Sequence, residues 1–174
     1  ELGYASDLDL IYLYDDDRMD SDMVYTRLVR RMMNWLTMQT SSGRLFEVDL
    51  RLRPNGADGL VVSSFDSWQK YERNEDGKGA WTWELQALTR ARFCAGDPSI
   101  GEKFEAERKR ILQSPRNRAE LASEVISMRQ RMLDGHKNPT ELFDIKHDRG
   151  GMVDIEFAVQ YLVLAYSKDF PELV

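Results

Sequence analysis

Several features that would restrict this protein to particular classes are scarce or missing. One cysteine, Cys94, stands among 174 residues, so no internal disulfide can form and a reducing compartment is favoured. No apolar run approaches the roughly 20 residues of a membrane-spanning helix, and no cationic, apolar secretory leader opens the sequence. Basic residues number 24 against 30 acidic ones, and this net charge of -6 disfavours generic nucleic-acid binding. We expect a soluble, cytoplasmic protein that binds neither membranes nor nucleic acid.

The first half combines strand and helix patterns. The run LDLIYLY at residues 8–14 predicts a buried strand that ends at an acidic loop. Ser21 is expected to cap a helix that ends near Thr40. Its buried face is predicted from helical spacing to contain Val24, Leu28, Met32, Trp35 and Leu36.

Two further strands and two short helices are expected next. After a turn at residues 41–43, apolar and polar residues alternate over 46–52, which predicts a second strand. The segment GLVVS at 59–63 predicts a third strand paired with the second. Ser64 begins a short helix, and another carries Trp81, Leu85 and Leu88. The pattern indicates an α+β class, with a small mixed sheet and helices.

The second half is predicted to be helical. Helices are expected at residues 99–113, 117–133 and 152–166. Their buried faces are predicted to contain Leu121, Val125, Met128 and Met132, and then Ile155, Val159, Leu162 and Tyr166. Asp97-Pro98 is the expected boundary, which gives domains at 1–97 and 98–174. The first of these holds 12 basic and 17 acidic residues (12 − 17 = −5), a bias that metal-binding carboxylates would produce.

The stretch Ser6-Asp7-Leu8-Asp9 carries the most chemical information. Residues two apart on a strand project from one face, so Asp7 and Asp9 can face one site at a spacing of about 6.6 Å. Such a pair could bridge two divalent cations. Asp49, on the polar face of the second strand, is the expected third carboxylate, with Glu47 in reserve. Clustered acids are costly unless a cation neutralises them, which favours a metal site.

Other interpretations of these residues remain open. The forked donors of Arg51 and Arg53 could bind triphosphate oxygens, but Asp49, Arg51 and Arg53 could also form salt bridges on an exposed strand face. Asp-x-Asp alone is more often a turn or strand-end feature. The run at residues 15–17 is expected to be a solvated loop. His136 and His147 lack a partner at metal-ligand spacing and are interpreted as surface residues.

Longer motifs resemble a known family. The segments SDLDLIYLYD, TSSGRLFEVDLRLRPNGADGLVVSS, AWTWELQALTRAR and FDIKHDRGGMVDIEF are similar, in this order, to the glutamine synthetase adenylyltransferase family. The resemblance implies a DNA polymerase beta-like nucleotidyltransferase fold, followed by the start of a helical domain similar to that of PII uridylyltransferases. Asp7, Asp9 and Asp49 match its three acids, which implies two Mg²⁺ ions and ATP as substrate.

The resemblance also implies an activity and partners. The chain is most similar to the C-terminal of the family's two catalytic domains, which transfers AMP from ATP to a tyrosine of glutamine synthetase. The PII signalling protein and glutamine would be further partners or effectors of the full enzyme. The N-terminal domain of the family removes AMP by phosphorolysis, and this activity stays open, as does a silent docking role. A nucleic-acid polymerising enzyme is disfavoured by the acidic balance.

Two details of the resemblance affect ATP binding. The family carries a Gly-Gly pair just before the position of Glu1, and without its backbone amides we expect ATP to bind weakly. The sequence starts without Met and is expected to be part of a longer chain. Ser6, Arg51, Arg53 and Lys146 are assigned to cofactor binding. Lys146, Asp154 and Glu156 could instead fix the helical domain onto the sheet, and for them this structural role is weighted slightly higher.

Overall fold

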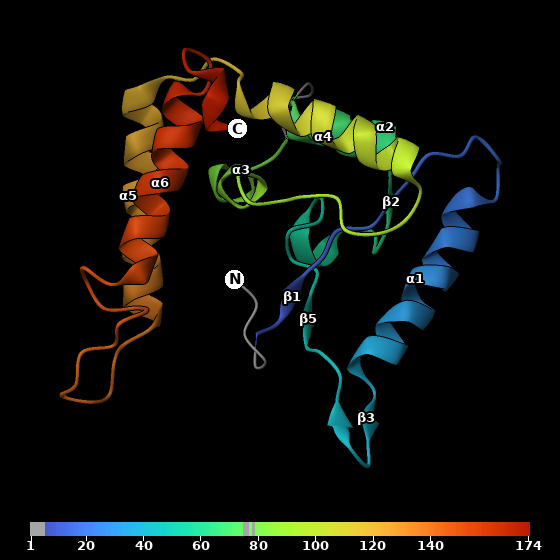
Figure 1. Ribbon diagram of the computed structural model, residues 1–174, viewed down its shortest axis with the longest axis horizontal. Helices are drawn as coiled ribbons and strands as arrows, with labels where there is room; N and C mark the ends of the chain where they lie inside the picture. The colour runs from blue at the N-terminus through green and yellow to red at the C-terminus, as the bar shows by residue number, and fades with distance from the viewer. Residues whose placement is uncertain (1–5, 75–76, 78) are drawn as a thin grey trace. The chain divides into compact units, whose positions relative to one another are not determined.

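A computed structural model describes residues 6–74, 77 and 79–174 (Figure 1). The chain forms two compact units. The first unit contains the described residues up to Ala80 together with Gly96–Ile100, and the second contains Trp81–Ala95 and Gly101–Val174. Six α-helices and small sheets occur among the described residues, so the fold class is α+β as expected. The domains at 1–97 and 98–174 stay a prediction.

Short strands build the first unit. They are β1 Leu8–Asp9, β2 Leu13–Tyr14, β3 Gln39–Thr40, β4 Gly43–Arg44, β5 Val48–Asp49 and β6 Ser63–Ser64. β1 pairs with β5 and β2 pairs with β6, both in parallel, and β1 and β5 run side by side in Figure 1. β3 and β4 form an antiparallel hairpin around the turn that the sequence predicted.

Two expectations about strands are wrong. The run at residues 8–14 is not one strand, because its two ends pair with different partners. Leu10 donates its amide hydrogen to the Asp49 carbonyl at 2.9 Å, whereas the Tyr12 carbonyl accepts from the Ser63 amide at 3.0 Å. The third strand consequently pairs with β2 and not with the second strand. Local alternation gives the face of a strand but carries no information about its neighbour.

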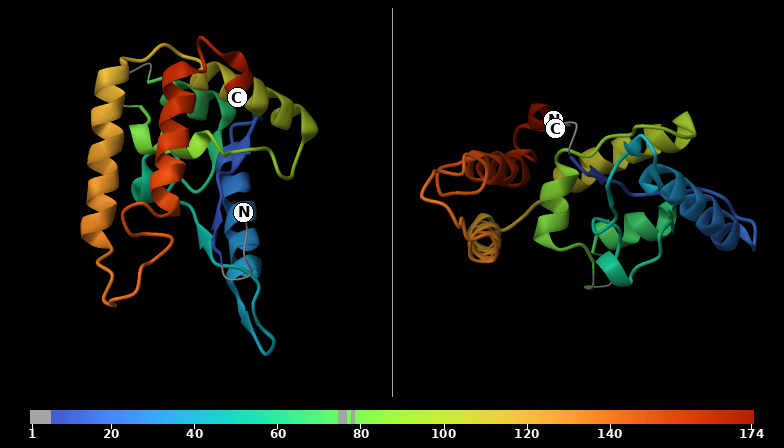
Figure 2. Two further views of the ribbon diagram at one scale, coloured as in Figure 1. Left: turned by 60° about the vertical axis from the view of Figure 1, so that its left-hand side comes forward. Right: turned by 90° about the horizontal axis from the view of Figure 1, so that it is seen from below.

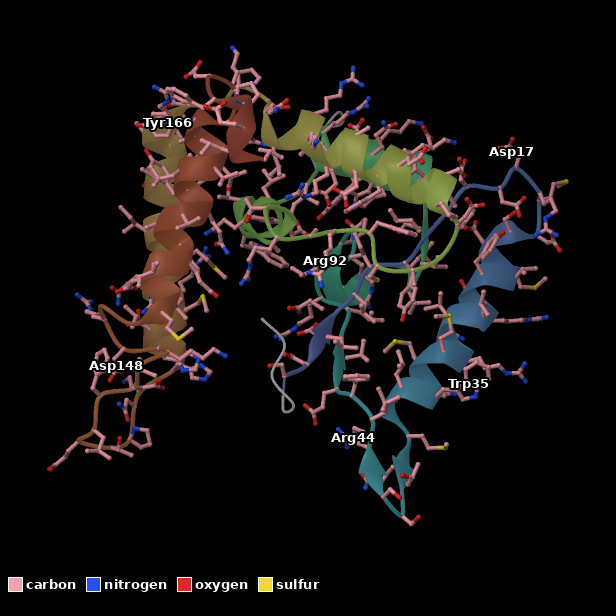
Figure 3. The ribbon with its side chains drawn as sticks, in the orientation of Figure 1. Asp17, Trp35, Arg44, Arg92, Asp148 and Tyr166 are labelled. Carbon is pink, nitrogen blue, oxygen red and sulfur yellow. The ribbon has the colours of Figure 1, made fainter. Side chains whose placement is uncertain are left out.

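Helix α1, Ser21–Thr37, covers the small core of the first unit with a different face from the one expected. Val29 on α1 packs with Tyr14 and Val62 in the buried cluster. Of the residues expected inside, Leu28 and Trp35 are 48% and 62% exposed. Figure 3 shows Trp35 on this helix. Apolar residues occur on two sides of α1, and the sheet buries the side that contains Val29.

Tyr14 connects β2 to the start of α1. Its ring stacks on that of Tyr25 with centroids 4.8 Å apart, and its hydroxyl donates a hydrogen bond to Asp22. This bond, together with burial, raises the pKa of Tyr14 to about 12. Ser21, the expected cap, is instead the first residue of the helix.

The remaining elements are helical. In the first unit, a 3-10 turn at Gly56–Asp58 precedes α2, Phe65–Glu72, which Ser64 caps as expected. The others are α3 Thr82–Leu88, α4 Pro98–Leu112, α5 Arg118–Gly135, α6 Met152–Tyr166 and a 3-10 turn at Pro171–Leu173. α5 and α6 pack along each other, as both views of Figure 2 show, and α3 contacts both. The predicted helix at 152–166 is confirmed at both ends.

The buried face of α6 differs from the predicted one. Val153, Gln160 and Leu164 are buried, whereas Ile155 and Val159 are 64% and 54% exposed. The Gln160 side-chain oxygen accepts a hydrogen bond from the Gln86 amide of α3 at 3.0 Å. A buried polar pair thus helps to set the orientation of a helix that is apolar on several sides.

Among the described residues, no helix combines the length and the apolarity that crossing a bilayer requires.

Candidate functional site

The register of β1 and β5 brings two of the predicted acids together. Asp9 lies opposite Asp49, and Leu8 lies opposite Val48. Neighbouring strands are about 4.8 Å apart, and residues in register on parallel strands project to the same side of the sheet. The Asp9 side chain is exposed, and that of Asp49 is 13% exposed. Two carboxylates therefore stand on neighbouring strands at a position that solvent can reach.

Asp7 belongs to the same electrostatic environment. It is exposed and precedes Asp9 by two residues. The hydrogen bond with Asp49 raises the pKa of the Arg51 guanidinium most strongly, and the negative charges of Asp9 and Asp7 raise it further. All three predicted acids thus act on one arginine.

Arg51 holds the carboxylate of Asp49. Its Nε donates to Asp49 Oδ2 at 2.7 Å, its Nη2 forms an ion pair with the same oxygen, and its backbone amide donates to Oδ1 at 2.8 Å. These hydrogen bonds hold the pKa of the Asp49 carboxyl below its usual value, so this group is ionised at neutral pH. Salt bridges among Asp49, Arg51 and Arg53 were one of the two interpretations that the sequence left open, and the pair between Asp49 and Arg51 is present.

Arg53 lies on the loop that follows Asp49. Its guanidinium donates to the carbonyls of Leu50, at 2.8 Å, and Gly59, at 3.1 Å. The loop is tight, because a Cβ atom on Gly59 would lie 1.9 Å from the Pro54 carbonyl oxygen. Arg53 therefore shapes the chain directly after the candidate acids.

The other predicted residues of the first unit lie nearby in sequence. Ser6 is half-buried and immediately precedes Asp7. Glu47, the reserve acid, forms an ion pair with Arg44 at 2.6 Å, and its carboxylate is 71% exposed. Its carbonyl accepts the Leu8 amide at 2.8 Å, so its backbone helps to join β5 to β1.

The acids have the chemistry of a magnesium site, although their side chains are not assembled into one. Carboxylate oxygens are the hard ligands that Mg²⁺ prefers, and the register of Asp9 and Asp49 suits a shared cation. Within residues 6–74, 77 and 79–174, however, no group of at least three histidine, cysteine or acidic side chains is positioned to hold a metal ion. The contact between Asp49 and Arg51 gives a physical reason, since Arg51 engages both oxygens of the carboxylate.

The predicted residues of the helical region belong to the second unit. Lys146 is exposed, its amide donates to Asp144 Oδ1 at 2.8 Å, and its carbonyl accepts the Val153 amide at 3.1 Å. Glu156 forms an ion pair with Arg90 at 3.1 Å, between α6 and the residues that follow α3. This ion pair is a contact within the helical unit.

Asp154 also acts within this unit. Its carboxylate accepts the Gly150 amide at 2.5 Å and forms an ion pair with Arg129 of α5. Arg129 is only 11% exposed and also donates to the His147 carbonyl at 2.8 Å. These bonds connect α5, α6 and the loop between them, where Figure 3 labels Asp148. The contacts of Asp154 and Glu156 favour a structural role for these two acids.

Asp16 of the acidic loop and the two histidines also have local partners. In the acidic loop, Asp16 pairs with Arg18 at 2.8 Å and accepts the Tyr25 hydroxyl at 3.0 Å. His136 and His147, expected as separate surface residues, stack on each other with ring centroids 4.5 Å apart. His136 is exposed, whereas His147 is half-buried.

Comparison with known proteins defines the class. Residues 1–107 match a family model described as glutamate-ammonia ligase adenylyltransferase, which is a class of nucleotidyltransferase. This match covers more than half of the chain. The chain belongs to the glutamate-ammonia ligase adenylyltransferase family.

Curated relatives carry a longer name. A bifunctional glutamine synthetase adenylyltransferase/adenylyl-removing enzyme of Ralstonia nicotianae is 58% identical over 173 residues, which are 99% of this chain and 18% of the relative. Proteins with the same name from Burkholderia mallei and Nitrosomonas europaea are 56% and 54% identical, over 100% and 99% of this chain and 19% and 18% of their own lengths. The chain thus spans less than a fifth of these relatives.

Proposed function

We propose that this chain transfers AMP from ATP to a tyrosine of glutamine synthetase and releases pyrophosphate. The observation that carries the proposal is the register of Asp9 against Asp49, in a chain of this family. We further propose that the first unit is a DNA polymerase beta-like nucleotidyltransferase core. Parallel pairing of the strand after Asp7 with the strand that ends at Asp49 supports this assignment.

The proposed mechanism depends on charge and position. Asp7 and Asp9 would hold two Mg²⁺ ions, and Asp49 would be a ligand of one of them. Bound Mg²⁺ supplies charge neutralisation at the α-phosphate and at the leaving pyrophosphate. The tyrosine oxygen forms a bond to the α-phosphorus, the bond from that phosphorus to the bridging oxygen breaks, and the hydroxyl proton passes to solvent. The pKa of the Asp49 carboxyl lies below its usual value, so the group is ionised at neutral pH. Its negative charge is proposed to help activate the hydroxyl.

Four further residues are proposed to contact the nucleotide: Ser6, Arg51, Arg53 and Lys146. Arg51 is the best supported, since it is 77% exposed beside the acids. Arg53 has two loop carbonyls as partners, so its part in binding is to fix the loop as well as to supply charge.

Removal of AMP by phosphorolysis is the second candidate. The relatives are named for both adenylyl transfer and adenylyl removal, and the same acids would serve either direction. The PII protein and glutamine are proposed as a partner and an effector of the longer enzyme.

The test uses this chain in place of the matching segment of the Ralstonia nicotianae relative. Glutamine synthetase is incubated with Mg²⁺, ATP and this chimera, and its intact mass is measured. A gain of one AMP per modified subunit supports transfer, and an Asp9→Asn variant should lower its rate by about a hundredfold or more. No gain while ATP binding is intact would reject it. Phosphate-dependent release of ADP from adenylylated glutamine synthetase would favour removal instead.

A further inference from the structure

The exposed Arg51 occupies the hydrogen-bond acceptors of Asp49, the candidate third acid. Arg51 donates to Asp49 Oδ2 from Nε at 2.7 Å and to Oδ1 from its backbone amide at 2.8 Å, and Nη2 pairs with Oδ2. A carboxylate held in this way has few remaining lone pairs directed toward a cation. Asp49, the proposed metal ligand, is thus already paired with the guanidinium of Arg51.

The burial of the two partners is unequal. The Asp49 side chain is 13% exposed, whereas that of Arg51 is 77% exposed. A partly buried carboxylate is stabilised by a positive neighbour, but an exposed guanidinium loses little when it returns to water. The contact is therefore well suited to exchange, with Asp49 staying in place and Arg51 moving.

The same guanidinium lies in the field of the other acids. It contacts Asp49 directly, and Asp9 lies opposite Asp49 in the register of β1 and β5. It therefore neutralises repulsion within a group of carboxylates, which is one part of what divalent cations do there. Metal ions and Arg51 would compete for Asp49.

We propose that Arg51 is an exchangeable internal cation: it holds Asp49 in the metal-free protein, is displaced when divalent cations bind, and then contacts the triphosphate of ATP. This inference rests on the proposed function, because it assumes that Asp49 is a metal ligand. It couples two binding events, since the metal releases the group that the nucleotide uses.

The inference predicts effects of opposite sign in one variant. Arg51→Met removes the competitor, so Mn²⁺ alone should bind about two- to fivefold more tightly, because fivefold corresponds to the roughly 1 kcal/mol at the upper end for an ion pair with an exposed partner. ATP with Mg²⁺ should bind about tenfold more weakly, because a charge-assisted contact to phosphate is lost. A merely structural role for Arg51 would weaken both.

The matched control is Arg44→Met. Arg44 is also exposed and pairs with an acid of the same segment, Glu47, at 2.6 Å. Its removal changes the net charge equally and should alter Mn²⁺ affinity by less than about twofold. Arg51→Lys separates charge from geometry, because a lysine keeps the charge but lacks the fork that engages Asp49. This variant should also bind Mn²⁺ more tightly than the unmodified chain.

Mn²⁺ binding to this chain, without ATP, is followed by the electron paramagnetic resonance signal of the free ion. ATP binding is measured separately by calorimetry, and circular dichroism verifies folding of each variant. Unchanged or weaker Mn²⁺ binding in Arg51→Met, or no Mn²⁺ binding by any variant, overturns the inference. An equal gain in Arg44→Met would also overturn it, because net charge would then explain the effect.

An Asp49→Asn variant separates the two proposals. If it weakens Mn²⁺ binding while Arg51→Met brings no gain, the exchange is rejected and the metal assignment stands. If Asp49→Asn leaves Mn²⁺ affinity unchanged, Asp49 is not a ligand and both fail.

Discussion

Two arginine–aspartate pairs, one in each unit, form the same kind of contact in different surroundings. In the first unit, Arg51 reaches Asp49 two residues away on its own segment and is 77% exposed. In the second, Arg129 of α5 reaches Asp154 of α6 and is 11% exposed. Both aspartates have a pKa below the usual value because of hydrogen bonds, with Arg51 the main donor to Asp49 and the Gly150 amide the main donor to Asp154. A lowered pKa therefore does not distinguish the candidate metal ligand Asp49 from Asp154, which connects two helices.

The difference lies in what surrounds each pair. Arg129 also donates to the His147 carbonyl, so its removal would take a donor away from two partly buried acceptors. The hydrogen bonds of Arg51 described above all go to Asp49, and the Arg51 side chain is already 77% exposed. A pair that can open without unfolding its surroundings is suited to chemistry, and one that cannot is suited to holding helices together.

The largest difference between the two pairs is expected when each aspartate is neutralised in turn. Asp49→Asn should lower AMP transfer in the chimera by about a hundred- to a thousandfold, because a charge at the reacting centre is lost, and should hardly change its stability. Asp154→Asn should change transfer by less than about fivefold while destabilising the helical unit. Mass spectrometry of glutamine synthetase and thermal unfolding are measured on both variants. The same loss of transfer in both would show that Asp154 also acts at the nucleotide.

Removal of each arginine should change the stability of the chain by a different amount. Arg129→Ala should lower the free energy of unfolding by about 2 kcal/mol, because Asp154 and the His147 carbonyl lose a buried donor. Arg51→Ala should lower it by less than about 1 kcal/mol, as for other exposed ion pairs. Urea unfolding followed by circular dichroism measures both. Equal losses would mean that exposure does not separate the two pairs.

Element bounds in the helical unit could be predicted because helix signals are local. Gly151 before α6 and the apolar pattern through Tyr166 define that helix within its own sequence. The buried side could not be predicted, since Ile155 and Val153 are equally apolar and distant partners decide between them. Gln86, for example, contacts Gln160 from 74 residues away.

For the candidate site, the sequence predicted which acids belong to it but not which partners their carboxylates have. Alternation placed Asp49 on the polar face of its strand, and the family resemblance matched it to Asp7 and Asp9. Their role as metal ligands stays a prediction. The orientation of Asp49 toward Arg51 could not be predicted, because a long side chain can reach several partners and its conformer depends on the surrounding field.

At acidic pH, the ion pair between Arg129 and Asp154 should contribute less to the free energy of unfolding. The pKa of Asp154 is lower in the folded chain than the unfolded value of about 3.9, so its stabilisation is present above that pH and is lost as the pH falls through the folded value. The difference in unfolding free energy between the unmodified chain and Arg129→Ala should shrink below about pH 4. Urea unfolding at a series of pH values measures it. A difference that stays constant or grows in acid would contradict the assigned ion pair.

The Tyr14 hydroxyl is a neutral donor to the carboxylate of Asp22. The effect of this contact on stability should be the smallest of those predicted. Its pKa is raised to about 12, so the folded chain retains the phenol proton more strongly than the unfolded chain, where the value is 10.0. The contact with Asp22 therefore stabilises the fold below about pH 10 and this contribution is lost as the pH rises through about 12. Tyrosinate absorbance of the unmodified chain minus that of Tyr14→Phe isolates this group. In an Asp22→Asn background the same difference should titrate closer to pH 10, because the main hydrogen bond is weakened. An unshifted titration there would assign the high pKa to burial of the ring and not to the carboxylate.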